Sequence, residues 1–218
     1  MEGPDVISID TADKYVNYVK EKVKADPARR SALRRSVGRP VDDVATRKAH
    51  AVVAPWLPTD RTRPAVESAY YSVAALIAVQ PRLGSQGAIT ESEGLADGRS
   101  GEHAGTERQK RERPSSSLGG TLGQAVQDKR LNADSVESRL HLLCRQDVPG
   151  LHRMLPGLVR QLAVKDVEPD WGRLLKDLSR WEYGRDQVTK QWLQDFYRTI
   201  NKPDQAEQND DNPESEDL

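Results

Sequence analysis

The stretch Asp170-Trp-Gly-Arg-Leu-Leu-Lys-Asp-Leu-Ser-Arg-Trp181 contains the clearest structural pattern in the chain. Its large apolar residues recur at positions i, i+3, i+4, i+7 and i+10: Trp171, Leu174, Leu175, Leu178 and Trp181. Residues with this spacing lie on one face of an α-helix, and an aspartate directly before them is a favourable N-cap. The pattern therefore predicts an amphipathic helix whose leucines and tryptophans are buried in a core.

Helical spacing also describes most of the remaining sequence, and alternating, strand-like runs are nearly absent. Apolar stripes, capping residues and Gly or Pro stops predict helices at about 10–25, 27–38, 41–53, 64–81, 118–126, 134–144, 151–162 and 188–197. The pair Pro156-Gly157 should kink or split one of them, because proline removes a backbone donor. We therefore predict an all-α protein with two helical bundles, at 1–81 and 118–201.

The segment 82–117 differs in composition from the rest of the chain. Gly, Ser, Glu, Arg and Thr dominate it, and Leu95 is nearly the only large apolar residue between Ala88 and Leu118. Such a segment cannot bury enough apolar surface to offset the entropy lost on ordering. We predict a long flexible loop that joins the bundles and ends in a basic run at 108–113.

Charge is unevenly distributed, although the formal net charge is only -1. The tail at 202–218 carries seven of the 34 acidic residues and no Lys or Arg after Lys202, so we predict an acidic, disordered tail. The remaining chain has about six more basic than acidic residues. This excess of positive charge in the chain without its tail is typical of a protein with a polyanion-binding surface. An ordinary domain with a solubilising acidic tail explains the same charge distribution equally well.

Sequence motifs for catalysis or metal binding are absent. The four histidines (His50, His103, His141 and His152) form no i, i+4 pair, and the single Cys144 cannot build a thiolate site. Gly-x-Ser-x-Gly, Walker-type and His-Glu-x-x-His motifs are missing, and the glycines at 118–123 lack a preceding strand. We expect no enzymatic activity, no metal and no cofactor. Without a signal peptide or an apolar span, we expect a cytoplasmic protein.

The second predicted helix and the position just after it hold an unusual group of arginines: Arg29, Arg30, Arg34, Arg35 and Arg39. Leu33 and Val37 supply a narrow apolar stripe that can dock this helix on a bundle. Guanidinium groups bind phosphates through paired hydrogen bonds, so the group is a candidate nucleic-acid site. A solvated basic face is the competing interpretation. Arg61 and Arg63 could extend the group, whereas the helical tryptophans are expected in the core rather than stacked on bases.

Three segments of the second half resemble the small subunit of the type I-E CRISPR Cascade complex, the CasB family. They are Glu137-Ser-Arg-Leu-His-Leu-Leu-Cys144, the 167–181 block around Asp170-Trp171, and Val188-Thr-Lys-Gln-Trp-Leu-Gln-Asp-Phe-Tyr197. Ala32-Leu-Arg-Arg35, Tyr71-Ser-Val-Ala-Ala-Leu76 and Ser117-Leu-Gly119 agree in order. The resemblance covers nearly all of the chain except 82–116 and the tail.

The resemblance implies a non-catalytic, all-helical subunit of an RNA-guided complex in antiviral defence. Its expected partners are other Cascade subunits, a second copy of itself, the guide–target hybrid and the displaced single DNA strand. It would stabilise the R-loop through backbone contacts, while base pairing reads the sequence. The family pattern matches Arg34, Arg35, Arg61 or Arg63, Arg139 and Arg185. Ser138 stands where a second arginine often occurs, and Pro156-Gly157 falls within a helix that is usually continuous.

Two other functions fit the composition of the chain. A helical DNA-binding transcriptional regulator would prefer one duplex sequence, and no polar recognition helix stands out. A protein-interaction scaffold would use the same arginines to bind acidic partners.

Overall fold

The computed structural model describes residues 7–58, 62–81 and 116–202. Within these ranges every regular element is helical and no strand occurs, so the all-α prediction is confirmed. The predicted loop, its basic run, Arg61 and the acidic tail after Lys202 lie outside the described residues. None of the helices in these ranges has the length and apolar character needed to cross a bilayer.

The first half of the chain folds into helices α1 (Ile9–Ala25), α2 (Pro27–Arg35), α3 (His50–Val53) and α4 (Pro64–Val79), with 3₁₀ turns at Val44–Ala49 and Ala54–Trp56. Helix α4 is apolar on most of its surface and is buried along its length. It is the central element onto which α1, α2 and α3 pack.

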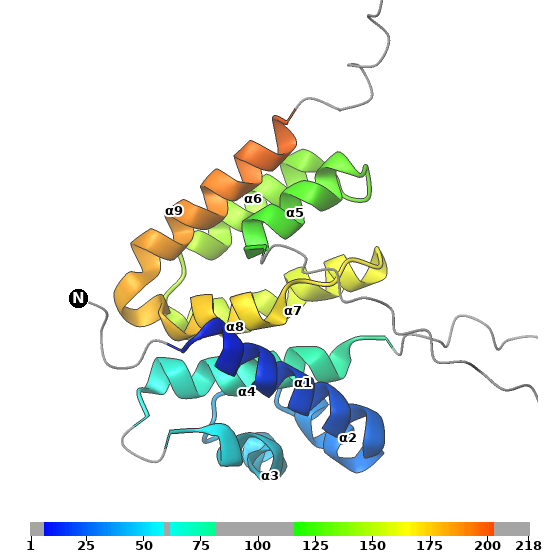
Figure 1. The fold of residues 1–218 in the computed structure, drawn as a ribbon, viewed down its shortest axis with the longest axis vertical. Coiled ribbons are helices and arrows are strands. Elements are labelled where there is room, and N and C mark those ends of the chain that lie inside the picture. The colour runs from blue at the N-terminus through cyan, green and yellow to red at the C-terminus, as the bar shows by residue number, and fades with distance from the viewer. Residues whose placement is uncertain (1–6, 59–61, 82–115, 203–218) are drawn as a thin grey trace, which may run out of the picture.

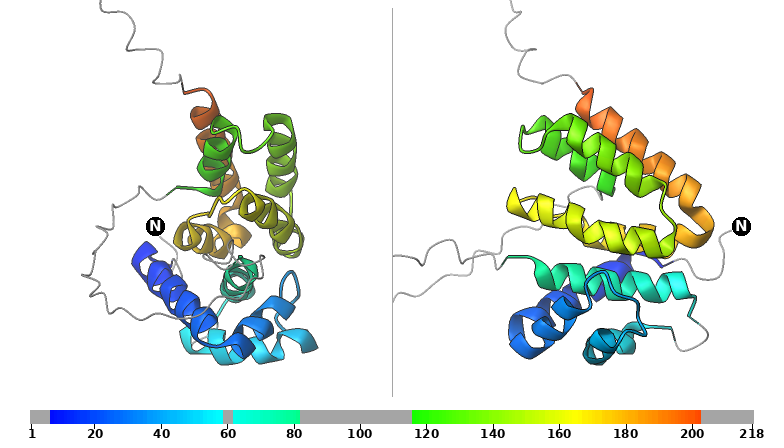
Figure 2. Two further views of the ribbon diagram at one scale, coloured as in Figure 1. Left: turned by 90° about the vertical axis from the view of Figure 1, so that its right-hand side faces the viewer. Right: turned by 180° about the vertical axis from the view of Figure 1, so that it is seen from behind.

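The second half contains α5 (Leu118–Gln127), α6 (Ala133–Cys144), α7 (Val148–Val164), α8 (Trp171–Ser179) and α9 (Trp181–Ile200). Figure 1 places α5, α6 and α9 at one end of the molecule and α1 to α4 at the other, with α7 and α8 between them. The two further views show the same order of layers (Figure 2). Helix α8 packs directly against α1 and α4, so the two halves of the sequence meet along it.

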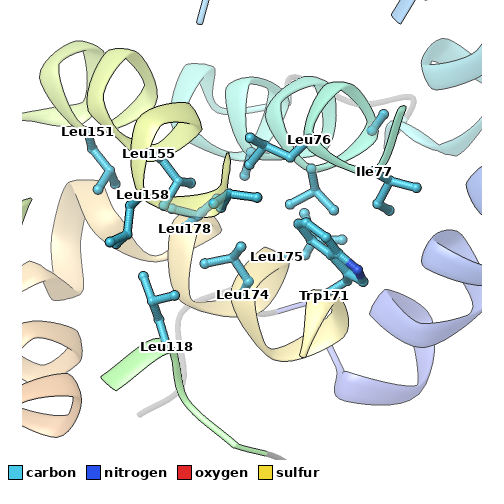
Figure 3. Close-up of a cluster of buried hydrophobic side chains, with 14 of the residues drawn as sticks. Leu76, Ile77, Leu118, Leu151, Leu155, Leu158, Trp171, Leu174, Leu175 and Leu178 are labelled. Atoms are coloured by element: carbon cyan, nitrogen blue, oxygen red, sulfur yellow. The ribbon is translucent and has the colours of Figure 1, made fainter. Parts of the chain in front are cut away.

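The helix predicted from the 171–181 stripe forms the centre of this contact. The side chains of Leu174, Leu175 and Leu178 are at most 1% exposed, and those of Trp171 and Trp181 at most 3%. In Figure 3 these leucines point toward residues of α4 and α7, with Leu118 of α5 on the opposite side. One continuous cluster of buried apolar residues includes members of both halves. The core assignment of the tryptophans is therefore confirmed.

The glycines at 118–123 serve helix packing. A Cβ atom on Gly119 would lie 1.8 Å from the carbonyl oxygen of Trp192, and one on Gly123 would lie 2.7 Å from Cβ of Thr199. Helices α5 and α9 can therefore run closely side by side only because these positions lack side chains. This accounts for a glycine-rich segment that carries no phosphate-binding pattern.

Three details of the predicted helices differ from the structure. Helix α7 runs through Pro156-Gly157 as one element, so of the predicted kink or split the split does not occur. The predicted helix at 41–53 is only a 3₁₀ turn followed by the short α3. The second helix ends at Arg35, and Gly38, at φ +68°, lies in the turn beyond it. Glycine adopts that left-handed conformation without steric cost.

Candidate nucleic-acid interface

Helix α2 carries the largest group of the predicted binding residues. Asp26 caps its first turn by accepting hydrogen bonds from the backbone N–H groups of Ala28 and Arg29, at 2.8 and 3.2 Å. Leu33 is fully buried, and the helix packs against α4 and the 3₁₀ turn at Val44–Ala49. The helix is therefore fixed at its N-terminus and along its inner face, so its exposed side chains start from a rigid backbone.

Arg34 and Arg35 lie in the last turn of α2 and are both exposed. Neither forms an ion pair or a hydrogen bond within the part of the chain that the structure describes. Cations are favoured at a helix C-terminus, where the helix dipole is negative. These two guanidinium groups can therefore bind phosphate without giving up an existing contact.

Arg29 and Arg39 form ion pairs on the surface. The Arg29 guanidinium lies 3.1 Å from Asp26, and that of Arg39 lies 3.2 Å from Asp43. The carboxyl pKa of Asp43 is lowered, first by a hydrogen bond from the backbone of Ala45 and then by Arg39. Exposed pairs of this kind contribute only about 0–1 kcal/mol, so a phosphate can replace either carboxylate.

Arg30 has a structural contact instead. Its guanidinium donates hydrogen bonds to the carbonyl oxygens of Ala78 and Gln80, at 3.1 and 2.6 Å, where α4 ends. Carbonyl groups in the last turn of a helix have no partner within the helix. Arg30 therefore joins α2 to the end of α4 and is a weaker candidate for phosphate binding than Arg34 or Arg35.

The turn after α2 brings another arginine close to this group. A Cβ on Gly38 would lie 4.0 Å from Cα of Arg153 in α7, so the turn packs directly on that helix. Arg39 and Arg153 both line a cavity of about 760 Å³ between the turn, α4 and α7. The sequence patterns did not single out Arg153. Its exposure depends on how α7 packs, and no pattern in the sequence marks it.

The same cavity is lined by a buried histidine, His152. Nδ1 of its ring lies 2.7 Å from the hydroxyl oxygen of Ser72, and Nε2 has no hydrogen-bond partner. Burial lowers the pKa of His152 to about 4. The ring is therefore neutral at pH 7 and adds no positive charge to the interface.

Arg63 and Arg185 are each placed relative to Tyr183, close to where α4 and α9 begin. The Arg63 guanidinium carbon lies 5.4 Å from the ring centroid of Tyr183, and Arg185 follows two residues later, with its Nε 3.7 Å from Asp186. Val148 lines both the cavity beside Arg153 and a second hollow bordered by Tyr183 and Arg185. Val148 thus links the hollow that Arg39 and Arg153 line with the hollow that Arg185 lines.

Arg139 is separate from both groups. It is exposed on α6 and donates a hydrogen bond to the side-chain oxygen of Gln161 on α7. The structure therefore does not gather the predicted residues into a single patch. Arg34, Arg35 and Arg39 form one group, and Arg63 with Arg185 forms the second.

The described histidines form hydrogen bonds with hydroxyl groups. Three described histidines contact hydroxyl groups: His50 with Tyr71, His141 with Tyr197, and His152 with Ser72. Within the described ranges, no three His, Cys, Asp or Glu side chains gather in an arrangement that could hold a metal ion. Burial raises the pKa of the Cys144 thiol to about 11, which makes it a poor nucleophile.

Fold and surface together define an all-helical protein, within the described ranges, that carries several exposed arginines. The family model for the CRISPR-associated protein Cse2 matches residues 29–197. The chain therefore belongs to the Cse2 family, and the resemblance to the Cascade small subunit is confirmed.

Solved structures agree with this family assignment. A chain of a CRISPR RNA-guided surveillance complex is 40% identical, with a TM-score of 0.69 over 88% of this chain and 94% of that one. A chain of such a complex described as pre-nicking is 41% identical, with a TM-score of 0.70 and the same coverage. CasB from M. ruber, at 22% identity over 87% of this chain and 94% of its own, has the same fold with a TM-score of 0.63. Comparison with curated protein sequences gave no match.

Proposed function

We propose that this protein is a non-catalytic small subunit of a CRISPR RNA-guided surveillance complex and binds nucleic-acid backbone to stabilise the R-loop. Its partners would be the other subunits, a second copy of itself, the guide–target hybrid and the displaced DNA strand, in the cytoplasm. Membership of the Cse2 family and about 40% identity to chains of such complexes support the place in the assembly.

The observation that carries the binding role is the pair Arg34 and Arg35. Two exposed arginines, which have no ion-pair or hydrogen-bond partner among the described residues, occupy consecutive positions at the end of a helix that is anchored by Leu33. Most contacts that hold a nucleic acid in position go to phosphates, and they carry no sequence information. Such contacts suit a subunit whose complex reads sequence by base pairing with a guide RNA.

The proposal is tested in an assembled complex. A surveillance complex is reconstituted with the wild-type subunit or with Arg34→Gln/Arg35→Gln, and the dissociation rate of a bound target duplex is measured. The control is Lys190→Gln/Lys202→Gln, which removes the same charge from two exposed positions at other points of the surface. Faster dissociation with the arginine variant alone is expected. Equal rates for all three complexes would refute the binding role.

A further inference from the structure

Tyr183 is an unusual aromatic residue in this structure. Its side chain is 45% exposed, and it is the one aromatic ring among the exposed large hydrophobic residues in the described ranges. Trp181, two positions earlier, is 1% exposed and donates a hydrogen bond from its indole to the carbonyl oxygen of Gln146 at 3.0 Å. Residues two apart on a helix point to nearly opposite sides, so the buried Trp181 fixes Tyr183 facing outward.

The backbone and a neighbouring cation add to this arrangement. Gly184 interrupts α9 directly after the tyrosine, with φ -124° and ψ 17°. The Arg63 guanidinium lies over the tyrosine ring at 5.4 Å from its centroid. A guanidinium plane and an aromatic ring are both surfaces on which nucleobases stack. Tyr183 and Arg63 therefore form a composite stacking surface. Tyr183 lies in the first turn of α9 and Arg63 is the N-cap residue of α4, so both residues are positioned by helices.

The hollow beside Tyr183 has the chemistry of a base pocket rather than a phosphate pocket. It measures about 540 Å³, and its lining residues include Tyr183, Arg185, the acidic residues Asp147, Glu182 and Asp186, and Gln187. Carboxylates repel phosphate and accept hydrogen bonds from the amino and imino groups of bases. Arg185 lines the hollow and Arg63 lies over the ring of Tyr183, so both can supply positive charge for the adjoining backbone.

We propose that Tyr183, with Arg63, is a stacking site for an unpaired nucleobase of a single strand that follows the arginines. The site rests on the proposed function and goes beyond it, because it adds a base contact to the backbone contacts. Stacking tolerates every base, since each has a π-face, so this contact is compatible with binding that does not depend on sequence. It also favours single strands over duplexes, whose bases are stacked on one another.

The test compares two fluorescent single strands of equal length by anisotropy. One is a mixed-sequence DNA, and the other carries abasic tetrahydrofuran units in place of all its nucleosides, so that it keeps only phosphates. The proteins are the full-length wild type, Tyr183→Ala, Tyr183→Phe, and Leu142→Ala as a control at a second exposed apolar residue, 49% exposed. Thermal unfolding confirms that each variant is folded.

Tyr183→Ala is expected to weaken binding of the base-containing strand by about 5- to 150-fold. It should leave binding of the abasic strand unchanged. Tyr183→Phe keeps the ring, and Leu142 does not line the hollow, so both variants should behave as wild type on both strands. Equal affinity of wild type and Tyr183→Ala for the base-containing strand would overturn the stacking site alone. If wild type bound neither strand at low salt, the proposed function would fail first.

Discussion

Replacing Gly119 by alanine tests the close packing of α5 on α9. The new methyl group would lie 1.8 Å from the carbonyl oxygen of Trp192, 2.5 Å from its carbonyl carbon and 2.8 Å from its Cα. These atoms belong to the backbone, so no side-chain rotation can relieve the contact and one helix must move. The movement disturbs the packing of Trp192 and Phe196, which are fully buried.

The magnitude follows from two opposing effects. Overpacking a core costs about 1–3 kcal/mol or more, whereas alanine is favoured over glycine within a helix by about 1 kcal/mol. Because every close atom here is backbone, we expect a net loss of about 2 kcal/mol, which lowers Tm by roughly 4–8 °C in a chain of this size.

Gly157 is a matched control for the same substitution. It also lies within a helix, α7, but a Cβ there would meet nothing within 4 Å. Gly157→Ala should therefore stabilise the protein by up to about 1 kcal/mol. The assay is urea unfolding followed by fluorescence of the buried tryptophans, with thermal unfolding alongside. A Gly119→Ala variant as stable as wild type, or two alanine variants with effects of the same sign, would refute the packing argument.

Three further predictions concern buried and partly buried groups. The pKa of His152 is depressed from 6.5 to about 4, so the unfolded chain binds the extra proton between these values. Stability should fall by up to about 3 kcal/mol as pH drops through this range, and His152→Gln should remove that dependence in unfolding measured at each pH. Cys144, with a pKa near 11, should react with iodoacetamide at pH 8 far more slowly than in urea, and equal rates would contradict its burial. Arg30→Ala should lower the free energy of unfolding by about 2 kcal/mol, because its two contacts with carbonyl groups are lost. Arg34→Ala should change the free energy of unfolding by no more than about 0.5 kcal/mol. Equal shifts of the unfolding midpoint in the two variants would show that Arg30 does not hold α4.

The helices could be predicted from the sequence wherever their apolar stripe is regular. The 171–181 pattern identified α8 and its buried leucines, because the spacing of apolar residues along a helix is a local property, although α8 ends at Ser179 and Trp181 begins α9. Its partners α1 and α4 could not be predicted, because contacts between distant segments leave no local pattern. The 41–53 segment was predicted as one helix although Val41 and the following residues belong to a turn.

The role of each arginine depends on information that composition does not contain. Arg30 and Arg34 are one helical turn apart and equally basic in sequence, yet only Arg30 meets the carbonyl groups at the end of α4. The difference between the two arginines arises from the position of the C-terminal end of α4, which the Arg30 guanidinium reaches. Tyr183 was missed for a similar reason, since an aromatic in a helical segment is usually a core residue. Its exposure follows from the orientation that the buried Trp181 imposes.

The central claim is that Arg34 and Arg35 bind phosphate, and the salt dependence of binding tests it most directly. Binding of a fluorescent single strand is measured across a salt series for wild type, Arg34→Gln/Arg35→Gln and the Lys190→Gln/Lys202→Gln control. Each phosphate contact contributes about 0.7 to the slope of log affinity against log salt for single strands. The arginine variant should therefore lose about 1.4 from the wild-type slope, while the control keeps it. An unchanged slope in the arginine variant would contradict the claim.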